Sequence, residues 1–177
     1  MKKALLDASS AILLYKANLL KELTEVYNVF VTRSVFGELT REKHHGTETF
    51  LSYVSQSKII VIDVENDPPT CNHSEESMNS LDLGEFDTIK CFVTGKHDFI
   101  ITDDGRAAKY CNKNGLSFIN ALLFPRLLYF ADSISWQGSN DKMNVIIFNG
   151  RYSSSVIEWA RNCQKESLFF AIPGPEV

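Results

Sequence analysis

Short apolar runs alternate along this chain with longer stretches in which hydrophobic residues recur every three or four positions. The short runs are typical of buried strands, and the longer stretches are typical of amphipathic helices. The pattern predicts strands at Ala4–Leu6, Val29–Thr32, Lys58–Ile62, Phe99–Thr102, Leu116–Ile119 and Met143–Phe148. It predicts helices at Ala11–Glu25, Val35–Lys43, Thr47–Val54, Asp82–Thr94, Arg106–Asn112, Ala121–Phe130 and Ser154–Gln164.

Local signals refine these boundaries. Ser34 is a predicted N-cap for the helix that follows it. Pro125 is expected to bend or interrupt the helix in which it lies. The stretch Asp63–Ser80 contains two prolines and few hydrophobic residues, which predicts a loop. No internal repeat is visible.

Strands separated by helices indicate β-α-β units and a mostly parallel sheet covered on both faces. The predicted fold class is therefore α/β. Ligands of such sheets bind at the edge formed by the carboxyl ends of the strands. The functional residues are expected at that edge.

Composition adds bounds to this prediction. The chain has 177 residues, enough for one domain or for one domain with an appended element. Its hydrophobic content of 44% and charged content of 23% are ordinary for a soluble globular protein. The formal net charge of −4 does not point to a nucleic-acid-binding protein, and it does not exclude one, since local basic patches and a bound metal can compensate.

The cysteines and the N-terminus suggest a cytoplasmic protein. No C-x-x-C pair is formed by the four cysteines, which argues against zinc and favours reduced, buried thiols: Cys71, Cys91, Cys111 and Cys163. No apolar run reaches the roughly 18 residues that cross a bilayer, so no membrane association is expected. The apolar stretch near the N-terminus ends at Asp7, too early for a signal peptide.

Acidic residues from four segments are predicted to meet at one edge of the sheet. Asp7 follows the first strand, and the pair Asp103–Asp104 follows the strand that ends at Thr102. Glu38 lies about one turn into the helix after the second strand, and Glu85 lies at the start of the helix that precedes Phe99–Thr102. Because two carboxylates about 4 Å apart repel by about 4 kcal/mol at an effective dielectric constant near 20, such a cluster favours a divalent cation. Oxygen ligands of this kind suit Mg²⁺ or Mn²⁺.

Each of these acids also has a local explanation. Asp7 could be a simple N-cap, and Glu85 could close a capping box with Asp82. Glu38 could face solvent on an amphipathic helix, and the Asp103–Asp104 pair could begin a turn or a helix. Asp87 lies two residues from Glu85, so it is a weaker ligand candidate and fits a solvated or secondary role.

Four motifs in this order resemble those of the PIN-domain family. Leu5-Leu6-Asp7-Ala8-Ser9 resembles the opening strand of that family, and Val29 to Leu39 resembles its second strand and glutamate-bearing helix. Leu81 to Ile89 resembles the Gly-Glu-Ala-Glu-Ala-Ile stretch of bacterial and archaeal members. Ile101 to Ala108 resembles their Thr-Asp-Asp-x-Ala motif. The resemblance covers about residues 1–131, and Phe86 departs from it by replacing a small residue.

This resemblance implies a three-layer α/β/α sandwich and cleavage of RNA that depends on Mg²⁺ or Mn²⁺. It implies a catalytic set of Asp7, Glu38, Glu85 and Asp104, with Asp7, Glu85 and Asp103 or Asp104 as metal ligands and Ser9 orienting a metal-bound water. Many small members resemble VapC-type toxins, which implies a homodimer and an antitoxin partner. Residues 132–177 are expected to add a strand and a helix that a minimal toxin lacks.

The cations nearest the acids could hold RNA phosphates or could be ordinary surface charges: Arg33, Arg41, Lys43, Arg106 and Lys109. Arg33 and Arg106 are the selected candidates for substrate binding. The leading hypothesis is a metal-dependent endoribonuclease. The alternatives are a PIN-like binding or regulatory module without catalysis and a metal phosphoesterase that acts on a small substrate.

Overall fold

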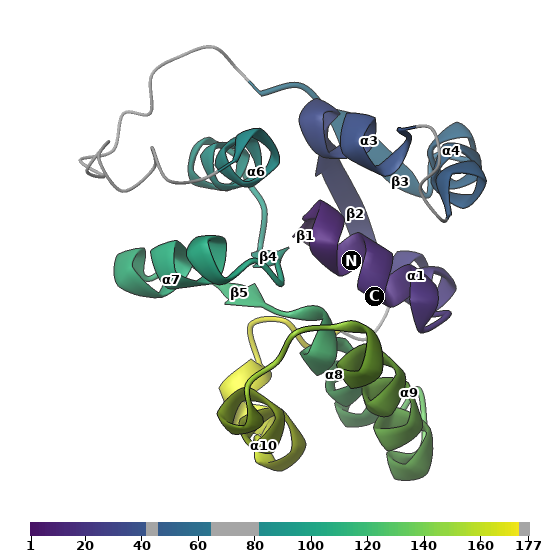
Figure 1. The fold of residues 1–177 in the computed structure, drawn as a ribbon, viewed down its shortest axis with the longest axis vertical. Coiled ribbons are helices and arrows are strands. Elements are labelled where there is room, and N and C mark those ends of the chain that lie inside the picture. Colours follow the sequence, from purple (N-terminus) through teal and green to yellow (C-terminus); the bar gives the residue numbers. More distant parts are fainter. Residues whose placement is uncertain (42–45, 65–81, 174–177) are drawn as a thin grey trace.

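The sheet is the centre of the molecule, and all of its strands are parallel (Figure 1). The computed structural model describes residues 1–41, 46–64 and 82–173. In these residues five strands pair in the order β3-β2-β1-β4-β5. They are β1 (Lys2–Leu6), β2 (Tyr27–Thr32), β3 (Ile59–Ile62), β4 (Phe99–Ile101) and β5 (Phe118–Ile119). The first five predicted strands are thus confirmed, and so is the parallel sheet.

Helices cover both faces of this sheet (Figure 1). They are α1 (Ala8–Lys16), α2 (Leu20–Val26), α3 (Arg33–Leu39), α4 (Thr47–Ser55), α6 (Leu83–Thr94), α7 (Gly105–Asn114), α8 (Phe124–Phe130), α9 (Trp136–Asn149) and α10 (Ser154–Asn162), with 3₁₀ turns η1 (Ala121–Leu123) and η2 (Lys165–Leu168).

Alternation along the strands produces the two cores. Leu5 and Ile100 are register partners, and both pack with residues of α6 and α7 on one face. Ala4 and Leu6 point to the opposite face and join the larger cluster, which includes residues of α1, α8 and α9. The result is the three-layer α/β/α sandwich of the predicted fold class.

The predicted strand Met143–Phe148 is wrong, because these residues belong to α9. Ser135 caps this helix by accepting a hydrogen bond from the Gly138 N–H at 3.0 Å. Along α9, Met143 and Ile146 are buried, whereas Phe148 is 90% exposed. Burial spaced by three residues is the pattern of a helix, and the C-terminal region is therefore helical rather than a strand followed by a helix.

Two other helix predictions change. The single helix predicted at Ala11–Glu25 is two helices, because Asn18 adopts a left-handed backbone conformation (φ 51°) that ends α1. The N-cap of α3 is Thr32 rather than Ser34, and α3 ends at Leu39. The predicted helix end at Lys43, most of the predicted loop Asp63–Ser80 and Cys71 lie outside the described residues. Pro125 lies in the first turn of α8, after the 3₁₀ turn η1.

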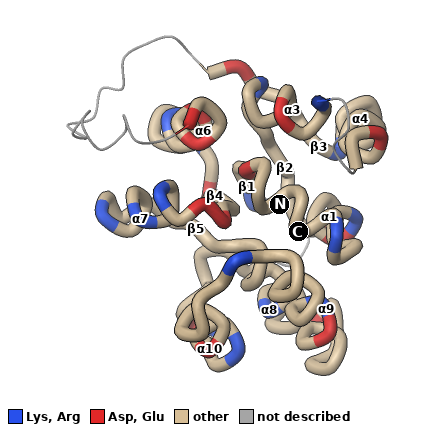
Figure 2. The backbone as a smooth tube through the Cα atoms, in the orientation of Figure 1, with Lys and Arg blue, Asp and Glu red and all other residues tan. Residues whose placement is uncertain are grey.

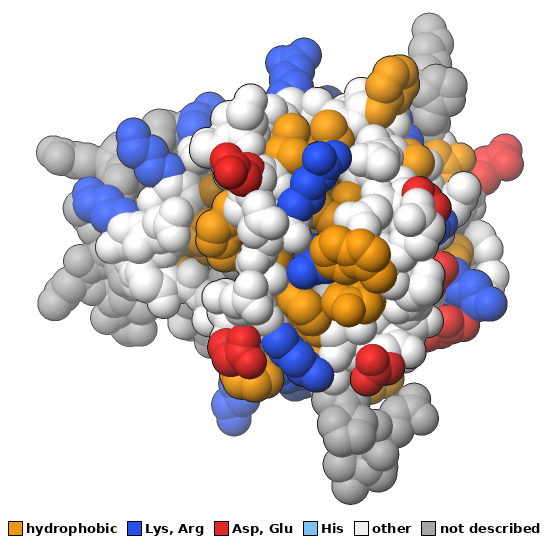
Figure 3. Space-filling view, turned by 90° about the horizontal axis from the view of Figure 1, so that it is seen from below, with side chains coloured by type: hydrophobic (Ala, Val, Ile, Leu, Met, Phe, Trp, Pro, Cys, Tyr) orange, Lys and Arg blue, Asp and Glu red, His pale blue; other side chains and the backbone are white. Residues whose placement is uncertain are grey.

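The residues after 131 pack into the same core as the sheet. Ala160 and Leu168 belong to the cluster that contains Ala4 and Leu6. The Lys2 Nζ donates to the backbone carbonyls of Phe169 and Phe170, each at 2.8 Å. Seen from the side of the C-terminal helices, hydrophobic side chains gather among charged ones (Figure 3).

The described cysteines are buried and are not joined in disulfides, as predicted: Cys91, Cys111 and Cys163. Over the described ranges, no helix has the length and apolar character needed to cross a membrane.

Candidate metal centre

Asp7 lies at the junction of two adjacent strands. It follows β1, and its Oδ2 accepts hydrogen bonds from Ser9 Oγ at 2.6 Å and from Thr102 Oγ1 at 2.9 Å. Thr102 directly follows β4, which pairs with β1, so the contact joins the carboxyl ends of neighbouring strands. In the sheet, β1 has β2 on one side and β4 on the other, so the strand order reverses at β1. Open α/β sheets bind ligands at the carboxyl ends of the strands beside such a reversal.

The Asp7 carboxylate is costly to keep charged in the metal-free protein. The residue is only 5% exposed. Burial raises the pKa of Asp7, and the nearby Asp103 carboxylate acts in the same direction, while the hydrogen bonds from Ser9 and Thr102 oppose the shift. Asp7 precedes α1 as its N-cap residue, but its side chain makes no capping hydrogen bond, so the carboxylate is not used to cap the helix.

Glu85 is held at the first turn of α6. Its backbone N–H donates to Asp82 Oδ1 at 3.0 Å, and its Oε2 accepts from the Asp82 N–H at 3.1 Å. The capping box considered from the sequence is therefore present. Glu85 Oε1 is not used by the cap and points to the start of α7, where it accepts from Arg106 Nη2 at 3.1 Å.

Asp104 caps α7 with one carboxylate oxygen. Its Oδ1 accepts from the backbone N–H groups of Arg106 at 2.7 Å and Ala107 at 2.9 Å. The same carboxylate lies close enough to that of Glu85 for each to shift the pKa of the other. Two carboxyl groups this close can share a hydrogen bond only when one of them carries a proton. The sequence prediction that Glu85 and Asp104 meet at this edge is therefore observed.

The two carboxyls have opposite pKa shifts. Burial and the adjacent Asp104 carboxylate raise the pKa of Glu85 to about 7, against the hydrogen bond from the Asp82 backbone. Although burial alone would raise the pKa of Asp104, hydrogen bonds from Ala107, Glu85 and Arg106 lower it below its usual value. Below about pH 7 the proton of this pair therefore resides on Glu85 rather than on Asp104. This divided titration is what two acids show when they share a site without a cation.

Glu38 approaches the same place from α3. An ideal Cβ on Gly84 would lie 3.5 Å from Glu38 Oε2 and 3.6 Å from Asp82 Oδ1. The Glu38 carboxylate therefore lies beside the start of α6, within van der Waals distance of position 84. Figure 2 shows the acidic residues of α3, α6 and the ends of β1 and β4 around one central region.

Arg106 supplies the positive charge in this arrangement. Its guanidinium lies 3.1 Å from Glu85, and 3.7 Å from both Asp82 and Asp104. The Glu85 carboxylate is the largest cause of the raised pKa of Arg106. As the side chains stand in residues 1–41, 46–64 and 82–173, no three Asp, Glu, His or Cys groups lie close enough to hold a metal.

The residues present fit Mg²⁺ or Mn²⁺ once this positive charge is displaced. The donors are carboxylate oxygens, which these cations prefer. The proton on Glu85 and the guanidinium of Arg106 each neutralise charge that a divalent cation could neutralise in their place. The side chain of Arg106 is 53% exposed, so it can leave without disturbing the core.

Asp103 has a different environment from Asp104. Its Oδ2 accepts from Ser10 Oγ at 2.6 Å and from the Ala121 N–H at 2.9 Å, and its Oδ1 accepts from the Tyr152 hydroxyl. Burial raises the pKa of Asp103 despite these hydrogen bonds. Both oxygens are taken up by three segments of the protein, so of the two aspartates Asp104 is the one that faces Glu85.

The structure places the remaining predicted residues as follows. Ser9 bonds the Asp7 carboxylate directly. Asp87 is half-buried on α6, and no contact joins it to the other acids in the described part of the chain. Arg33 pairs with Asp63, with Nη2 and Oδ2 2.9 Å apart. Arg41 and Lys109 are exposed.

Sequence reasoning missed Thr102 and Tyr152. The hydroxyl of Thr102 donates to Asp7 and accepts from the Asp104 N–H at 3.3 Å, so it links two candidate ligands. Its position directly before Asp103–Asp104 was a usable signal, since a hydroxyl at a strand end can bond neighbouring carboxylates. Tyr152 lies 49 residues from its partner Asp103 and in a region with no motif, so nothing in the sequence indicated it.

Replacing Arg106 with Gln is expected to lower the melting temperature of the metal-free protein at pH 8 and to enlarge the stabilisation by Mn²⁺. The reason is that Glu85 and Asp104 lose their guanidinium partner and keep their mutual repulsion. Thermal unfolding with EDTA and with Mn²⁺ measures both effects. Arg161→Gln is the matched control, because Arg161 bonds Asn144 between the C-terminal helices. Equal Mn²⁺ shifts in the two variants would contradict the prediction.

A family model described as "PIN domain" matches residues 3–124 of the chain. The match contains Asp7, Glu38, Glu85 and Asp104 and ends at the first residue of α8. No curated protein and no solved structure matched the chain.

Proposed function

Since this chain belongs to the PIN-domain family, we propose that it is a metal-dependent endoribonuclease that hydrolyses RNA phosphodiester bonds with Mg²⁺ or Mn²⁺. The family has a nuclease-type fold, and the proposal assigns this chain its reaction, its cofactor and its substrate. The observation that carries the proposal is the contact between Glu85 and Asp104, which gives Glu85 a pKa of about 7 at the edge where β1 and β4 end.

Asp7, Glu85 and Asp104 would hold the metal, and Glu38 would complete the site from α3. When bound, such a cation polarises a phosphoryl oxygen and lowers the pKa of a bound water. Ser9 and Thr102 fix the Asp7 carboxylate through their hydroxyls, and Thr102 also holds the Asp104 backbone. These contacts orient the acids before a substrate arrives.

Helix starts favour a phosphate at this edge. Asp7 precedes α1, Asp82 precedes α6 and Asp104 precedes α7, so the N-termini of three helices face the same side of the sheet. Each helix N-terminus carries partial positive charge and free backbone N–H groups. Arg106, once released from Glu85, is placed to contact a phosphate oxygen from the start of α7.

A PIN-like binding module without catalysis is the second candidate. The observation that favours it is the Arg106 guanidinium, which pairs with Glu85 and lies near Asp82 and Asp104. Such a module would keep the ion pair as its permanent state and would not need a metal. A toxin role with an antitoxin partner and a homodimeric state belongs to the nuclease proposal, and the resemblance of the motifs to VapC-type toxins supports it.

We expect the purified protein to cleave single-stranded RNA with Mn²⁺ and to be inactive with EDTA. Cleavage of a labelled RNA is followed on a denaturing gel, and Mn²⁺ binding is followed by titration calorimetry. Heat from millimolar or tighter Mn²⁺ binding is expected for the nuclease, and its absence together with intact RNA would favour the binding module. Turnover of a model phosphodiester that excess RNA does not inhibit would favour a small-substrate phosphoesterase.

A further inference from the structure

The loop between α9 and α10 reaches the acidic edge of the sheet. The hydroxyl of Tyr152 in this loop donates a hydrogen bond to Asp103 Oδ1. The family match ends at residue 124, so this loop comes from a part of the chain that the family model does not include. The C-terminal helices therefore contribute a residue to the surroundings of the candidate site.

Asp103 connects this loop to the proposed ligands. The residue before it, Thr102, bonds Asp7, and the residue after it, Asp104, contacts Glu85. Asp103 itself bonds Ser10 in α1, which follows the Ser9 that holds Asp7. Tyr152 thus bonds the residue that lies in sequence between Thr102, which bonds Asp7, and Asp104, which contacts Glu85.

Within this loop the backbone of Gly150 lies in close contact with the Tyr152 ring. A Cβ on Gly150 would overlap the Tyr152 ring and would lie 3.0 Å from the Ile146 carbonyl oxygen. The ring cannot move aside without losing its bond to Asp103. A glycine at position 150 is therefore required for Tyr152 to reach the edge in this way.

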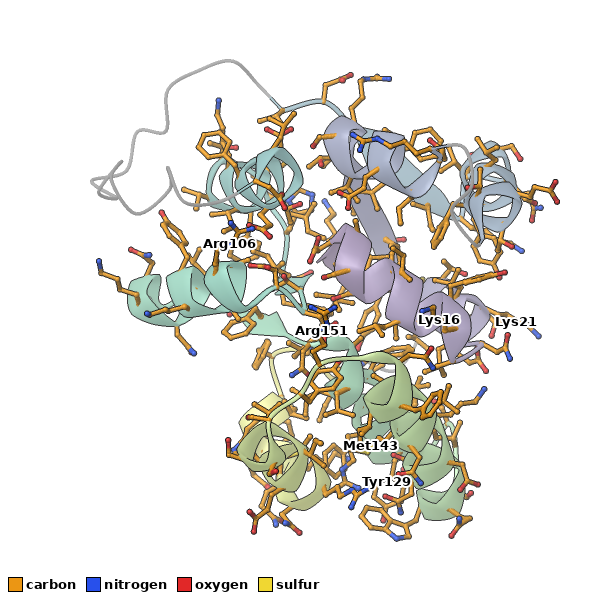
Figure 4. The ribbon with its side chains drawn as sticks, in the orientation of Figure 1. Lys16, Lys21, Arg106, Tyr129, Met143 and Arg151 are labelled. Atoms are coloured by element: carbon orange, nitrogen blue, oxygen red, sulfur yellow. The ribbon has the colours of Figure 1, made fainter. Side chains whose placement is uncertain are left out.

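Arg151 is presented by this anchored loop. The backbone is extended at Gly150 and at Ser153, and successive side chains along an extended chain leave on opposite sides. With Tyr152 directed into the protein, the Arg151 side chain is exposed. Figure 4 shows it near the middle of the view, between α1, the start of α7 and the C-terminal helices.

Arg151 differs from the arginines selected from the sequence. Arg33 is paired with Asp63, and Arg106 is paired with Glu85. No ion pair to Arg151 exists within the described ranges. An exposed guanidinium next in sequence to the residue that bonds Asp103, and without a carboxylate partner in the described part of the chain, is available to an anionic ligand.

We propose that Arg151 binds a phosphate of the RNA strand next to the one that is cleaved, and that Tyr152 is the positioning residue that holds it there. This inference rests on the proposed function, because it takes the acidic edge as the place where RNA lies. It assigns the C-terminal helices a role in substrate binding. RNA is favoured over a small phosphomonoester because a monoester has no second phosphate for Arg151 to bind.

The first test is RNA binding, which does not require cleavage. Anisotropy of a fluorescein-labelled oligouridylate is measured with EDTA at several salt concentrations. Arg151→Gln is expected to weaken binding by roughly 3- to 10-fold and to reduce the slope of log K against log salt by about 0.7, the value for one phosphate contact on a single strand. Arg151→Lys should keep the slope. Lys113→Gln is the control, because this exposed lysine makes the same charge change in the last turn of α7.

The second test separates positioning from folding. Tyr152→Phe removes only the hydroxyl, and Gly150→Ala moves the ring without changing charge. Both are expected to weaken RNA binding while the salt slope stays that of the wild type, since Arg151 remains. In cleavage with Mn²⁺, Arg151→Gln should raise KM and leave kcat within about twofold, because a uniform binding contact is lost.

The two proposals fail in different ways. If the wild type cleaves RNA with Mn²⁺ and Arg151→Gln behaves like Lys113→Gln, the role of Arg151 is wrong and the nuclease stands. If the wild type binds RNA through Arg151 and does not cleave it, the nuclease is wrong and the role of Arg151 stands. If the wild type binds no RNA, both are wrong.

Discussion

Replacing Asp7 with Asn is expected to abolish Mn²⁺-dependent RNA cleavage while the protein stays folded. The amide oxygen of Asn can still accept the hydrogen bonds from Ser9 and Thr102, so the local structure has no reason to change. The charge that would bind the cation is lost. Because the loss of a group that only orients a metal ligand costs about 10- to 100-fold, the loss of a ligand itself should cost at least about 100-fold in kcat.

Asp7→Asn is not expected to destabilise the metal-free protein, although it abolishes cleavage. Burial raises the pKa of Asp7, so the charged carboxylate opposes folding of the metal-free protein at neutral pH. Asp7→Asn is therefore expected to leave the melting temperature in EDTA unchanged or to raise it, and to remove the increase caused by Mn²⁺. Glu48→Gln in the first turn of α4 is the control, since Glu48 is exposed and distant in sequence from every candidate ligand. Equal cleavage by wild type and Asp7→Asn would refute the proposed role of Asp7.

The edge at which the acids meet was predictable because it depends only on topology. In a parallel sheet every strand ends on the same side, so Asp7 after β1 and Asp104 after β4 had to lie near each other. The start of α6 was placed there by the same reasoning, since α6 leads into β4. What topology could not give is the contact itself. The close approach of Glu85 to Asp104 depends on rotamers and on the capping box that orients Glu85.

The C-terminal region was mispredicted for a physical reason. Val145, Ile146 and Ile147 are β-branched residues in a short apolar run, which is equally consistent with a strand and with a helix segment. The tertiary structure decides for the helix, because Met143 and Ile146 fill the core while the N-cap at Ser135 starts the helix seven or more residues earlier. The prediction of a strand at Met143–Phe148 also gave no reason to place the following loop near Asp103, so the contact of Tyr152 with Asp103 was missed.

Arg106 makes contacts in the structure that the sequence did not predict. It was selected from the sequence as a phosphate-binding residue, and that role stays a prediction. In the structure it neutralises the acids instead, at the position from which a phosphate could be contacted. The sequence places Arg106 two residues after Asp104, but only the structure reveals that its guanidinium reaches Glu85 on another helix.

The pH dependence of stability should be reversed by metal. Glu85 has an ordinary pKa of 4.5 when unfolded and a pKa of about 7 when folded, so between these values the folded protein binds the extra proton. Its contribution to stability is fully present below pH 4.5 and is lost as pH rises to about 7. The raised pKa values of Asp7 and Asp103 act in the same direction. The metal-free protein is therefore expected to melt at a lower temperature at pH 7.5 than at pH 5.

Mn²⁺ should stabilise the protein most where the metal-free form is weakest, because ligand carboxylates must be deprotonated to bind it. At a metal concentration about 100 times Kd the gain is about 2.7 kcal/mol, which for a chain of this size raises the melting temperature by roughly 5 to 10 °C. At pH 5 the proton on Glu85 competes with the cation, and the increase should be small. Thermal unfolding from pH 5 to 8, with EDTA or with Mn²⁺, measures both curves.

Glu85→Gln links these effects to one side chain. Gln retains the capping box, since its amide oxygen can accept from the Asp82 N–H. It cannot titrate, so the variant should show a smaller fall in stability between pH 4.5 and 7, with the remainder due to Asp7 and Asp103, and should lose most of the stabilisation by Mn²⁺. If Glu85→Gln kept the wild-type pH dependence, Glu85 would not be the group that holds the proton. If it kept the Mn²⁺ shift, Glu85 would not be a ligand, and the cation would have to bind through Asp7 and Asp104 without it.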